Sequence, residues 1–275
     1  TAIVMEPETG AIRAVANLGR TKEGKYYEKL NYAIGESHEP GSTFKLMALV
    51  AALEDQVIDT TTVFDTQNGE LTFYGKYKVR DSRKGGYGKI PITEIFERSS
   101  NTGMVQAIYN EYNSKPEQFV NRLMNMGLSE PLGLPIVGEA KPVIPHPDKK
   151  GWSGISLPWM AYGYGVLMTP MQTLTFYNAI ANDGVMVRPR FIEGTQNKRS
   201  QIKKQSEVEI INPSICSKET IGKVKSMLKG VVEKPWGTAH NIYDSNFAIS
   251  GKTGTCQLDY NTEEVQYVAS FVGYF

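Results

Sequence analysis

A serine and a lysine three residues apart, Ser42 and Lys45, are the first residues in the sequence whose types and spacing could do chemistry. They follow Pro40-Gly41 and open an apolar run that predicts a helix over residues 42–55. Residues three apart on a helix share a face, so the lysine amine can reach the serine hydroxyl. A neutral amine that takes the hydroxyl proton makes the oxygen a nucleophile, so this pair predicts nucleophilic catalysis by Ser42.

Two features of the surroundings would make Lys45 a better base. Partial burial and a second cation both lower the pKa of a lysine, which keeps its amine neutral. The start of a helix also offers free backbone N–H groups and a partial positive charge, which stabilise a developing oxyanion. The spacing alone is a weak signal, because Ser200-Gln-Ile-Lys203 and Ser226-Met-Leu-Lys229 share it.

Two further triplets carry residues of the right chemistry. Ser99-Ser-Asn101 follows a short predicted helix and is expected at a helix-to-loop junction, where it could equally be an ordinary cap or turn. Lys252-Thr-Gly254, followed by Thr255, falls on the penultimate predicted strand. A lysine and two hydroxyls suit the binding of a carboxylate, and a glycine allows backbone to approach backbone. Taken alone, this triplet could also be a strand with an exposed lysine.

The elements that must position these residues follow from periodicity and turn residues. Strand pairs are expected at both ends of the chain, over residues 2–6 with 11–16 and over 247–257 with 265–275, the latter joined by the turn Asp259-Tyr-Asn-Thr262. Helices are expected over residues 42–55, 94–98, 170–182 and 218–232, and after a capping box at Ser114-Lys-Pro-Glu117. The sequence therefore predicts one α/β (α+β) domain over residues 1–275, in which the N- and C-terminal strands form an antiparallel sheet flanked by helices. The α/β lobe spans about residues 1–60 and 215–275, and an inserted, mainly helical lobe spans about residues 61–214.

In this order and on these elements, the three motifs match the pattern of class A β-lactamases and penicillin-binding proteins. Longer stretches resemble the class B penicillin-binding proteins, the monofunctional transpeptidases of cell division and elongation, with the division type favoured. The similarity runs along nearly the whole chain and is strongest at Glu39-Pro-Gly-Ser-Thr-Phe-Lys45, Arg98-Ser-Ser-Asn-Thr-Gly103, Tyr162-Gly-Tyr-Gly165 with Thr169-Pro170, and Gly251-Lys-Thr-Gly-Thr255.

This resemblance implies a role for each motif residue. The catalytic set is the nucleophile Ser42, its base Lys45, the proton relay Ser99 beside Lys252, and Asn101, which orients the donor amide. The substrate-binding set is Thr253, Gly254 and Thr255, which receive the terminal carboxylate, and the implied oxyanion hole is the backbone N–H groups of Ser42 and Thr255. No cofactor and no metal are implied.

The implied reaction is ping-pong acyl transfer between peptidoglycan stem peptides. D-Ala leaves the donor, an acyl-enzyme forms on Ser42, and an amine of a neighbouring stem peptide resolves it into a cross-link. A β-lactam would mimic the donor and stall as the acyl-enzyme.

Two rival functions share the fold. A D,D-carboxypeptidase or serine β-lactamase would pass the acyl group to water, and a class A β-lactamase needs a carboxylate that activates this water. Glu117 comes too soon after Asn101 and suits the capping box better, which leaves Glu139 in a loop rich in Pro and Gly. A non-enzymatic β-lactam sensor domain would use the same serine, but the class B stretches argue against it.

Composition excludes several partners. Lys and Arg total 30 against 29 Asp and Glu, a formal net charge of +1, which gives no reason to expect nucleic acid.

Cys216 and Cys256 do not form a disulfide framework and are predicted to be small core residues, with Cys256 turned away from Thr255 by strand alternation. The longest apolar run, residues 46–53, is too short to span a bilayer.

The ends of the chain predict a piece of a longer protein, since it begins at Thr1 and stops at Phe275 within a strand-like stretch. By resemblance, a further strand between the two terminal hairpins and a C-terminal helix are expected to be missing, which would split the sheet. The parent protein is expected on the periplasmic face of the cytoplasmic membrane, which it would contact only through an anchor outside this chain, and divisome proteins are candidate partners.

Overall fold

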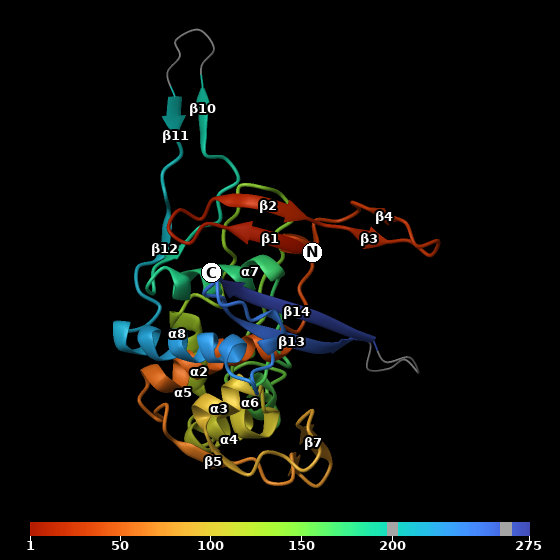
Figure 1. The fold of residues 1–275 in the computed structure, drawn as a ribbon, viewed down its shortest axis with the longest axis vertical. Coiled ribbons are helices and arrows are strands. Elements are labelled where there is room, and N and C mark those ends of the chain that lie inside the picture. Colours follow the sequence, from red (N-terminus) through yellow and green to blue (C-terminus); the bar gives the residue numbers. More distant parts are fainter. Residues whose placement is uncertain (197–202, 259–265) are drawn as a thin grey trace.

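The computed structural model describes residues 1–196, 203–258 and 266–275 (Figure 1). Its strands are β1 (Ala2–Met5), β2 (Ile12–Ala16), β3 (Gly19–Arg20), β4 (Tyr26–Tyr27), β5 (Val63–Asp65), β6 (Glu70–Phe73), β7 (Tyr77–Arg80), β8 (Lys89–Pro91), β9 (Met186–Val187), β10 (Gly194–Gln196), β11 (Lys203–Gln205), β12 (Ile210–Asn212), β13 (Ser250–Leu258) and β14 (Gln266–Tyr274). Its α-helices are α1 (Tyr32–Gly35), α2 (Lys45–Glu54), α3 (Ile92–Glu97), α4 (Asn101–Tyr112), α5 (Pro116–Asn125), α6 (Ser156–Met160), α7 (Pro170–Ala181) and α8 (Lys218–Glu233), and its 3-10 helices are η1 (Gly41–Phe44) and η2 (His240–Ile242).

The strands form antiparallel pairs rather than one continuous sheet. The N-terminal hairpin pairs β1 with β2, and the C-terminal hairpin pairs β13 with β14 over residues 250–258 and 266–274. In the described part of the chain no ladder joins these two hairpins, and α7 lies between them (Figure 1). The mixed α/β fold and the split of the terminal sheet are thus confirmed. The predicted turn at residues 259–262 lies outside the described residues.

Helix α2 is the centre of the helical part of the molecule. Every residue from Lys45 to Leu53 is buried, and the helix packs against α4, α5 and α8. A helix that is apolar on all sides belongs inside a core, which is why the run of residues 46–53 has no polar face. The predicted helix over residues 42–55 differs in one respect, because its first turn is the 3-10 helix η1 and the α-helix begins only at Lys45.

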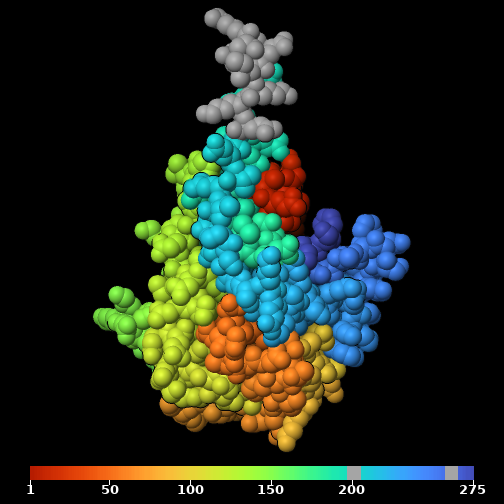
Figure 2. Space-filling view, turned by 90° about the vertical axis from the view of Figure 1, so that its left-hand side faces the viewer, coloured from red at the N-terminus to blue at the C-terminus, as the bar shows by residue number. Residues whose placement is uncertain are grey.

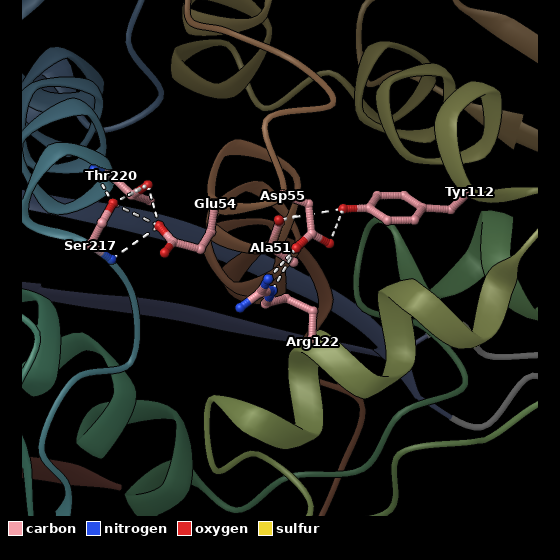
Figure 3. A network of polar contacts seen from close by, with 7 residues as sticks. All are labelled: Ala51, Glu54, Asp55, Tyr112, Arg122, Ser217 and Thr220. Atoms are coloured by element: carbon pink, nitrogen blue, oxygen red, sulfur yellow. Dashed lines mark hydrogen bonds and ion pairs between the residues drawn. The ribbon is translucent and has the colours of Figure 1, made fainter.

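The C-terminal end of α2 is fixed to α4 and α5 by Asp55, the residue that follows the helix (Figure 3). Tyr112 of α4 donates its hydroxyl to Asp55 Oδ2 at 2.8 Å, and Arg122 of α5 donates from Nε to Oδ1 at 2.6 Å. The tyrosine ring is buried, so a hydrogen-bond partner for its hydroxyl is needed there. One carboxylate therefore joins three helices.

Glu54 makes the matching connection to α8. Its Oε2 accepts hydrogen bonds from the hydroxyls of Ser217, at 2.8 Å, and Thr220, at 2.6 Å, and Ser217 caps the start of α8 (Figure 3). Figure 2 looks onto this face, where α8 lies directly above the orange segment that follows α2. A carboxylate beside a helix N-terminus also meets its partial positive charge.

Three helix starts differ in how well the structure matches the sequence expectations. The capping box at residues 114–117 is wrong, because α5 has Lys115 as its N-cap without a side-chain hydrogen bond, and Pro116 opens the helix. Helix α4 was not predicted, so residues 99–101 join two helices rather than a helix and a loop. The start at Thr169-Pro170 is confirmed, with a complete capping box between Thr169 and Gln172.

Two remaining expectations concern the core and the membrane. Cys216 and Cys256 are both buried, as predicted, and both are free thiols, a point that the sequence left open. Across the residues that the structure describes, we find no helix whose length and apolar character would suit a membrane crossing.

Candidate active site

Close backbone packing holds the turn that carries Ser42. Gly41 has φ +54°, and a Cβ on it would lie 2.6 Å from the carbonyl oxygen of Thr255. The Gly41 N–H donates to the carbonyl of Gly163 at 3.1 Å, and a Cβ on Gly163 would lie 2.0 Å from Gly41 O. Only glycine fits at these two positions, which explains why the motif before Ser42 contains Pro40-Gly41. Ser42 itself is half-buried at the start of η1.

Lys45 is completely buried one residue after η1. Its Nζ donates to Ser99 O at 2.7 Å, to Ser99 Oγ at 3.1 Å and to Asn101 Oδ1 at 2.6 Å. In a 3-10 turn side chains three apart eclipse, so Ser42 and Lys45 emerge on the same side. The structure thus brings together the first two motifs.

Ser99 adopts an uncommon backbone conformation for a non-glycine residue, with φ +56°. This conformation lets both its carbonyl and its hydroxyl oxygen meet the same amine, that of Lys45. The amide of Asn101 is held on both sides, because its Oδ1 accepts from Lys45 and its Nδ2 donates to Arg80 O at 2.7 Å. The orientation of this amide is therefore set by a lysine on one side and a carbonyl on the other.

Lys252 reaches the same hydroxyl from the opposite direction. It is completely buried on β13, and its Nζ donates to Ser99 Oγ at 2.8 Å and to Thr253 O at 3.1 Å. The amine also lies over the ring of Phe96, 5.7 Å from the centroid. Ser99 Oγ consequently bridges two lysine amines that come from chain segments far apart in the sequence.

Burial controls the charge of these two amines. Desolvation lowers the pKa of Lys45 to about 7, although the carboxylate of Asp81 acts in the opposite direction. Desolvation, and then the charge of Lys45, lower the pKa of Lys252 well below its usual value. Two ammonium groups on one hydroxyl repel each other, so the pair favours a state in which one amine is neutral. A neutral amine beside a serine is the base that the sequence pattern requires.

Asp81 is a functional residue that the sequence did not reveal. Its Oδ1 accepts the backbone N–H of Asn101 at 2.6 Å and of Thr102 at 2.9 Å. Its Oδ2 accepts the hydroxyls of Ser100 and Thr102, each at 2.9 Å. The carboxylate fixes the N-terminal turn of α4 and hence Asn101. It follows β7 in the segment over residues 64–90 without periodicity, so no pattern marks it.

Strand β13 presents the third motif against η1. A Cβ on Gly254 would lie 2.8 Å from Thr43 Cγ2, so only glycine allows this approach. Thr255 is exposed and Cys256 is buried, which confirms the predicted alternation. The carbonyl of Thr255 faces Gly41, and in an antiparallel strand the N–H and C=O of one residue point to the same side.

The two rival carboxylates lie on elements that serve other purposes. Both carboxylate oxygens of Glu139 accept backbone N–H groups of its own loop, those of Leu132 and Leu134. Glu117 lies in the first turn of α5, a helix whose Arg122 is bound to the far end of α2. Glu139 thus stabilises a loop, and Glu117 is on the helix that supports α2 from the other end.

The model of the penicillin binding protein transpeptidase domain matches residues 1–275, so this chain belongs to that family. PbpB of Mycolicibacterium smegmatis is 28% identical over 271 residues, which cover 94% of this chain and 40% of that protein. Stage V sporulation protein D of Bacillus subtilis is 27% identical, over 99% of this chain and 42% of that protein. The chain therefore spans about two fifths of these curated relatives.

Solved structures agree with this assignment. Penicillin-binding protein 3 from Mycobacterium tuberculosis in complex with aztreonam matches with a TM-score of 0.80 and 27% identity, over 98% of this chain and 62% of that one. The apo transpeptidase domain of penicillin-binding protein 3 from Burkholderia pseudomallei matches with a TM-score of 0.77 and 26% identity, over 98% and 74% of the two chains. The resemblance to class B penicillin-binding proteins is confirmed.

Proposed function

We propose that this domain is a peptidoglycan D,D-transpeptidase that cross-links stem peptides through an acyl-enzyme on Ser42. The observation that carries the proposal is the bridge of Ser99 Oγ between the buried amines of Lys45 and Lys252, at 3.1 and 2.8 Å. Relatives point the same way, since the peptidoglycan D,D-transpeptidase FtsI of Escherichia coli is 27% identical over 67% of this chain.

Acylation begins when neutral Lys45 takes the proton of Ser42 and Oγ attacks the carbonyl carbon between the two D-Ala residues. The developing oxyanion accepts hydrogen bonds from the backbone N–H groups of Ser42 and Thr255. The backbone of Thr255 faces the turn that carries Ser42, which supports this role. The C–N bond then breaks, and Ser99 gives its hydroxyl proton to the leaving nitrogen. Lys45 returns the proton of Ser42 to Ser99, so D-Ala departs with one added proton and the acyl group remains on Ser42.

Deacylation runs through the same groups in reverse. The amine of a neighbouring stem peptide attacks the ester carbon, and its proton passes through Ser99 and Lys45 to Ser42 Oγ as the C–O bond breaks. A new amide, the cross-link, forms and Ser42 regains its proton. Asn101 has a fixed amide orientation and serves to hold the donor peptide, while Thr253 and Thr255 serve to hold the donor carboxylate, with Gly254 allowing close approach.

β-Lactams fit this scheme as donor mimics, and we propose that they acylate Ser42. One of the structures that match with a TM-score of 0.80 is a complex with the β-lactam aztreonam. Opening of the lactam keeps the leaving nitrogen attached to the acyl group, so the amine acceptor cannot replace it and the adduct persists.

The test is the mass of the intact protein after mixing with benzylpenicillin, followed for hours. We expect one added penicillin mass that persists in the parent chain and is absent from Ser42→Ala. The matched control is Ser226→Ala, which removes an exposed serine of the same Ser-x-x-Lys spacing on α8 and should behave as the parent. An adduct that clears within minutes would favour a hydrolase, and no adduct on the folded parent would contradict the proposal.

We also propose that the parent protein acts at the periplasmic face of the cytoplasmic membrane during cell division, together with divisome proteins. The support is family membership and the division-type resemblance of the motifs. Fluorescent tagging of the full-length protein tests this proposal, with enrichment at the division site as the expected result and uniform labelling of the side wall as the contrary one.

A further inference from the structure

A hydroxyl outside the three motifs lies at the edge of the site. Thr238 Oγ1 is 2.7 Å from Thr253 Oγ1, and this contact is open to solvent. Thr238 belongs to the loop between α8 and η2, whereas Thr253 belongs to β13. Two different segments therefore place their hydroxyls together at the third motif, at a point open to solvent.

The position of Thr238 is fixed by the elements around it. Its N–H donates to Glu97 O at 3.2 Å, and the neighbouring Trp236 donates from Nε1 to Glu97 Oε2 at 2.7 Å. A Cβ on Gly237 would lie 2.2 Å from Val231 O, so the turn requires glycine next to Thr238. Glu97 lies at the end of α3, two residues before Ser99, so the same helix that leads to the proton relay also holds this turn.

Two hydroxyls at this distance share one hydrogen atom, and the accepting hydroxyl keeps its own hydrogen free. When Thr238 donates to Thr253 Oγ1, the Thr253 hydrogen is free for an anion, and each hydrogen bond in such a chain strengthens the next. The reverse order would direct the hydrogen of Thr253 away from the substrate. An arriving carboxylate selects the first order because it can only accept.

We propose that Thr238 is a positioning residue, which orients the hydroxyl of Thr253 toward the terminal carboxylate of the donor. This role rests on the proposed function, since it names the substrate group that the hydroxyl pair receives. It predicts that the loss of the Thr238 hydroxyl weakens binding of carboxylate-bearing donors and leaves the bond-forming steps at Ser42 unchanged.

The test compares benzylpenicillin, which carries a free carboxylate, with its methyl ester, which does not. Acylation rates are measured over a range of concentrations for the parent, Thr238→Val, Thr238→Ser and the control Thr195→Val, an exposed threonine on β10. In Thr238→Val we expect the half-saturating concentration of benzylpenicillin to rise about 3–10-fold, the effect of one hydrogen bond, with an unchanged limiting rate. The methyl ester should react equally with both proteins, and Thr238→Ser should restore the parent value.

Three results would overturn this role. An equal loss for the acid and the ester would mean that Thr238 only supports the fold of the turn. No loss for the acid would mean that the hydroxyl contact has no effect on the carboxylate. Failure of Thr238→Ser to restore binding would mean that the hydroxyl is not the group that matters. Absence of acylation in the parent chain itself is a separate result, which would overturn the proposed function first.

Discussion

The two ends of helix α2 differ in how their charged groups are paired. At the C-terminal end two carboxylates accept hydrogen bonds from neighbouring donors, whereas at the N-terminal end the amine of Lys45 shares a hydroxyl with a second amine. Asp55 accepts from Tyr112 and Arg122, and Glu54 accepts from the hydroxyls that open α8. Lys45 and Lys252 instead point their amines at one hydroxyl, that of Ser99. One helix thus joins a region of matched polar groups to a region of like charges.

The difference shows how the same shift in pKa can have opposite meanings. Burial alone would raise the pKa of Glu54, but hydrogen bonds from Thr220 and Ser217 lower it, so the charged form is the favoured one. Burial lowers the pKa of Lys45 to about 7, so the charged form is the disfavoured one. The carboxylates hold the helices together, whereas the neutral amine that burial favours at Lys45 is the form that the proposed base requires.

The largest effect is expected from removing the base. Lys45→Met keeps the length and apolar stem of the side chain but has no amine, so acylation by benzylpenicillin should slow by about 10²–10⁴-fold. Folding should persist, because an uncharged side chain fits a buried site. The rate of adduct formation is the measurement, and Lys229→Met, an exposed lysine of the same spacing on α8, is the control. An acylation rate within threefold of the parent rate would mean that Lys45 is not the base.

The next effect is a pH dependence that only the N-terminal end should have. Protonation of Lys45 removes the base, so the acylation rate should fall as the pH falls below about 7 and level off above it. Each unit of pH below that point costs about tenfold in the neutral fraction, so the rate at pH 5 should be about 100-fold lower. Rates measured from pH 5 to 9 test this, and a flat profile would contradict the assignment of Lys45 as base.

The smallest effect belongs to the C-terminal end and should appear in stability. Asp55→Ala leaves the buried hydroxyl of Tyr112 and the guanidinium of Arg122 without their partner. We expect a loss of about 2 kcal/mol in the free energy of unfolding, reduced from the full buried value because the arginine is partly exposed. Urea denaturation measures this loss, and the acylation rate of the folded variant should match the parent. Slow acylation with unchanged stability would mean that the C-terminal end of α2 contributes to acylation rather than to stability.

The sequence predicted the residues whose spacing is local. Ser42 and Lys45 are three residues apart, and β13 alternates between exposed Thr255 and buried Cys256, as expected for a strand. The family resemblance predicted that Ser99 lies beside Lys252. These residues are 153 positions apart, so no local periodicity could connect them. Local chemistry and resemblance together therefore indicated most of the candidate site.

The residues that sequence reasoning missed act through distant partners. Asp81 binds the start of α4, 20 residues further along, and its own segment has no periodic face. Thr238 acts on Thr253 from a loop that reads as an ordinary polar connection. Helix α4 begins with Asn101, whose polar side chain indicated a turn, because the carboxylate that stabilises this helix start comes from elsewhere in the fold.

The bridge across Ser99 also has a consequence for the order of events during synthesis. Ser42, Lys45 and Ser99 are translated before Lys252 and Thr255, which follow about 150 residues after Ser99. A nascent polypeptide that ends before residue 250 contains Ser42 but lacks the second amine and the strand that faces η1. Since domains fold as units once their sequence is available, the bridge across Ser99 forms only after β13 has been made. If the proposed function holds, a chain that has not yet reached β13 should form no adduct with benzylpenicillin.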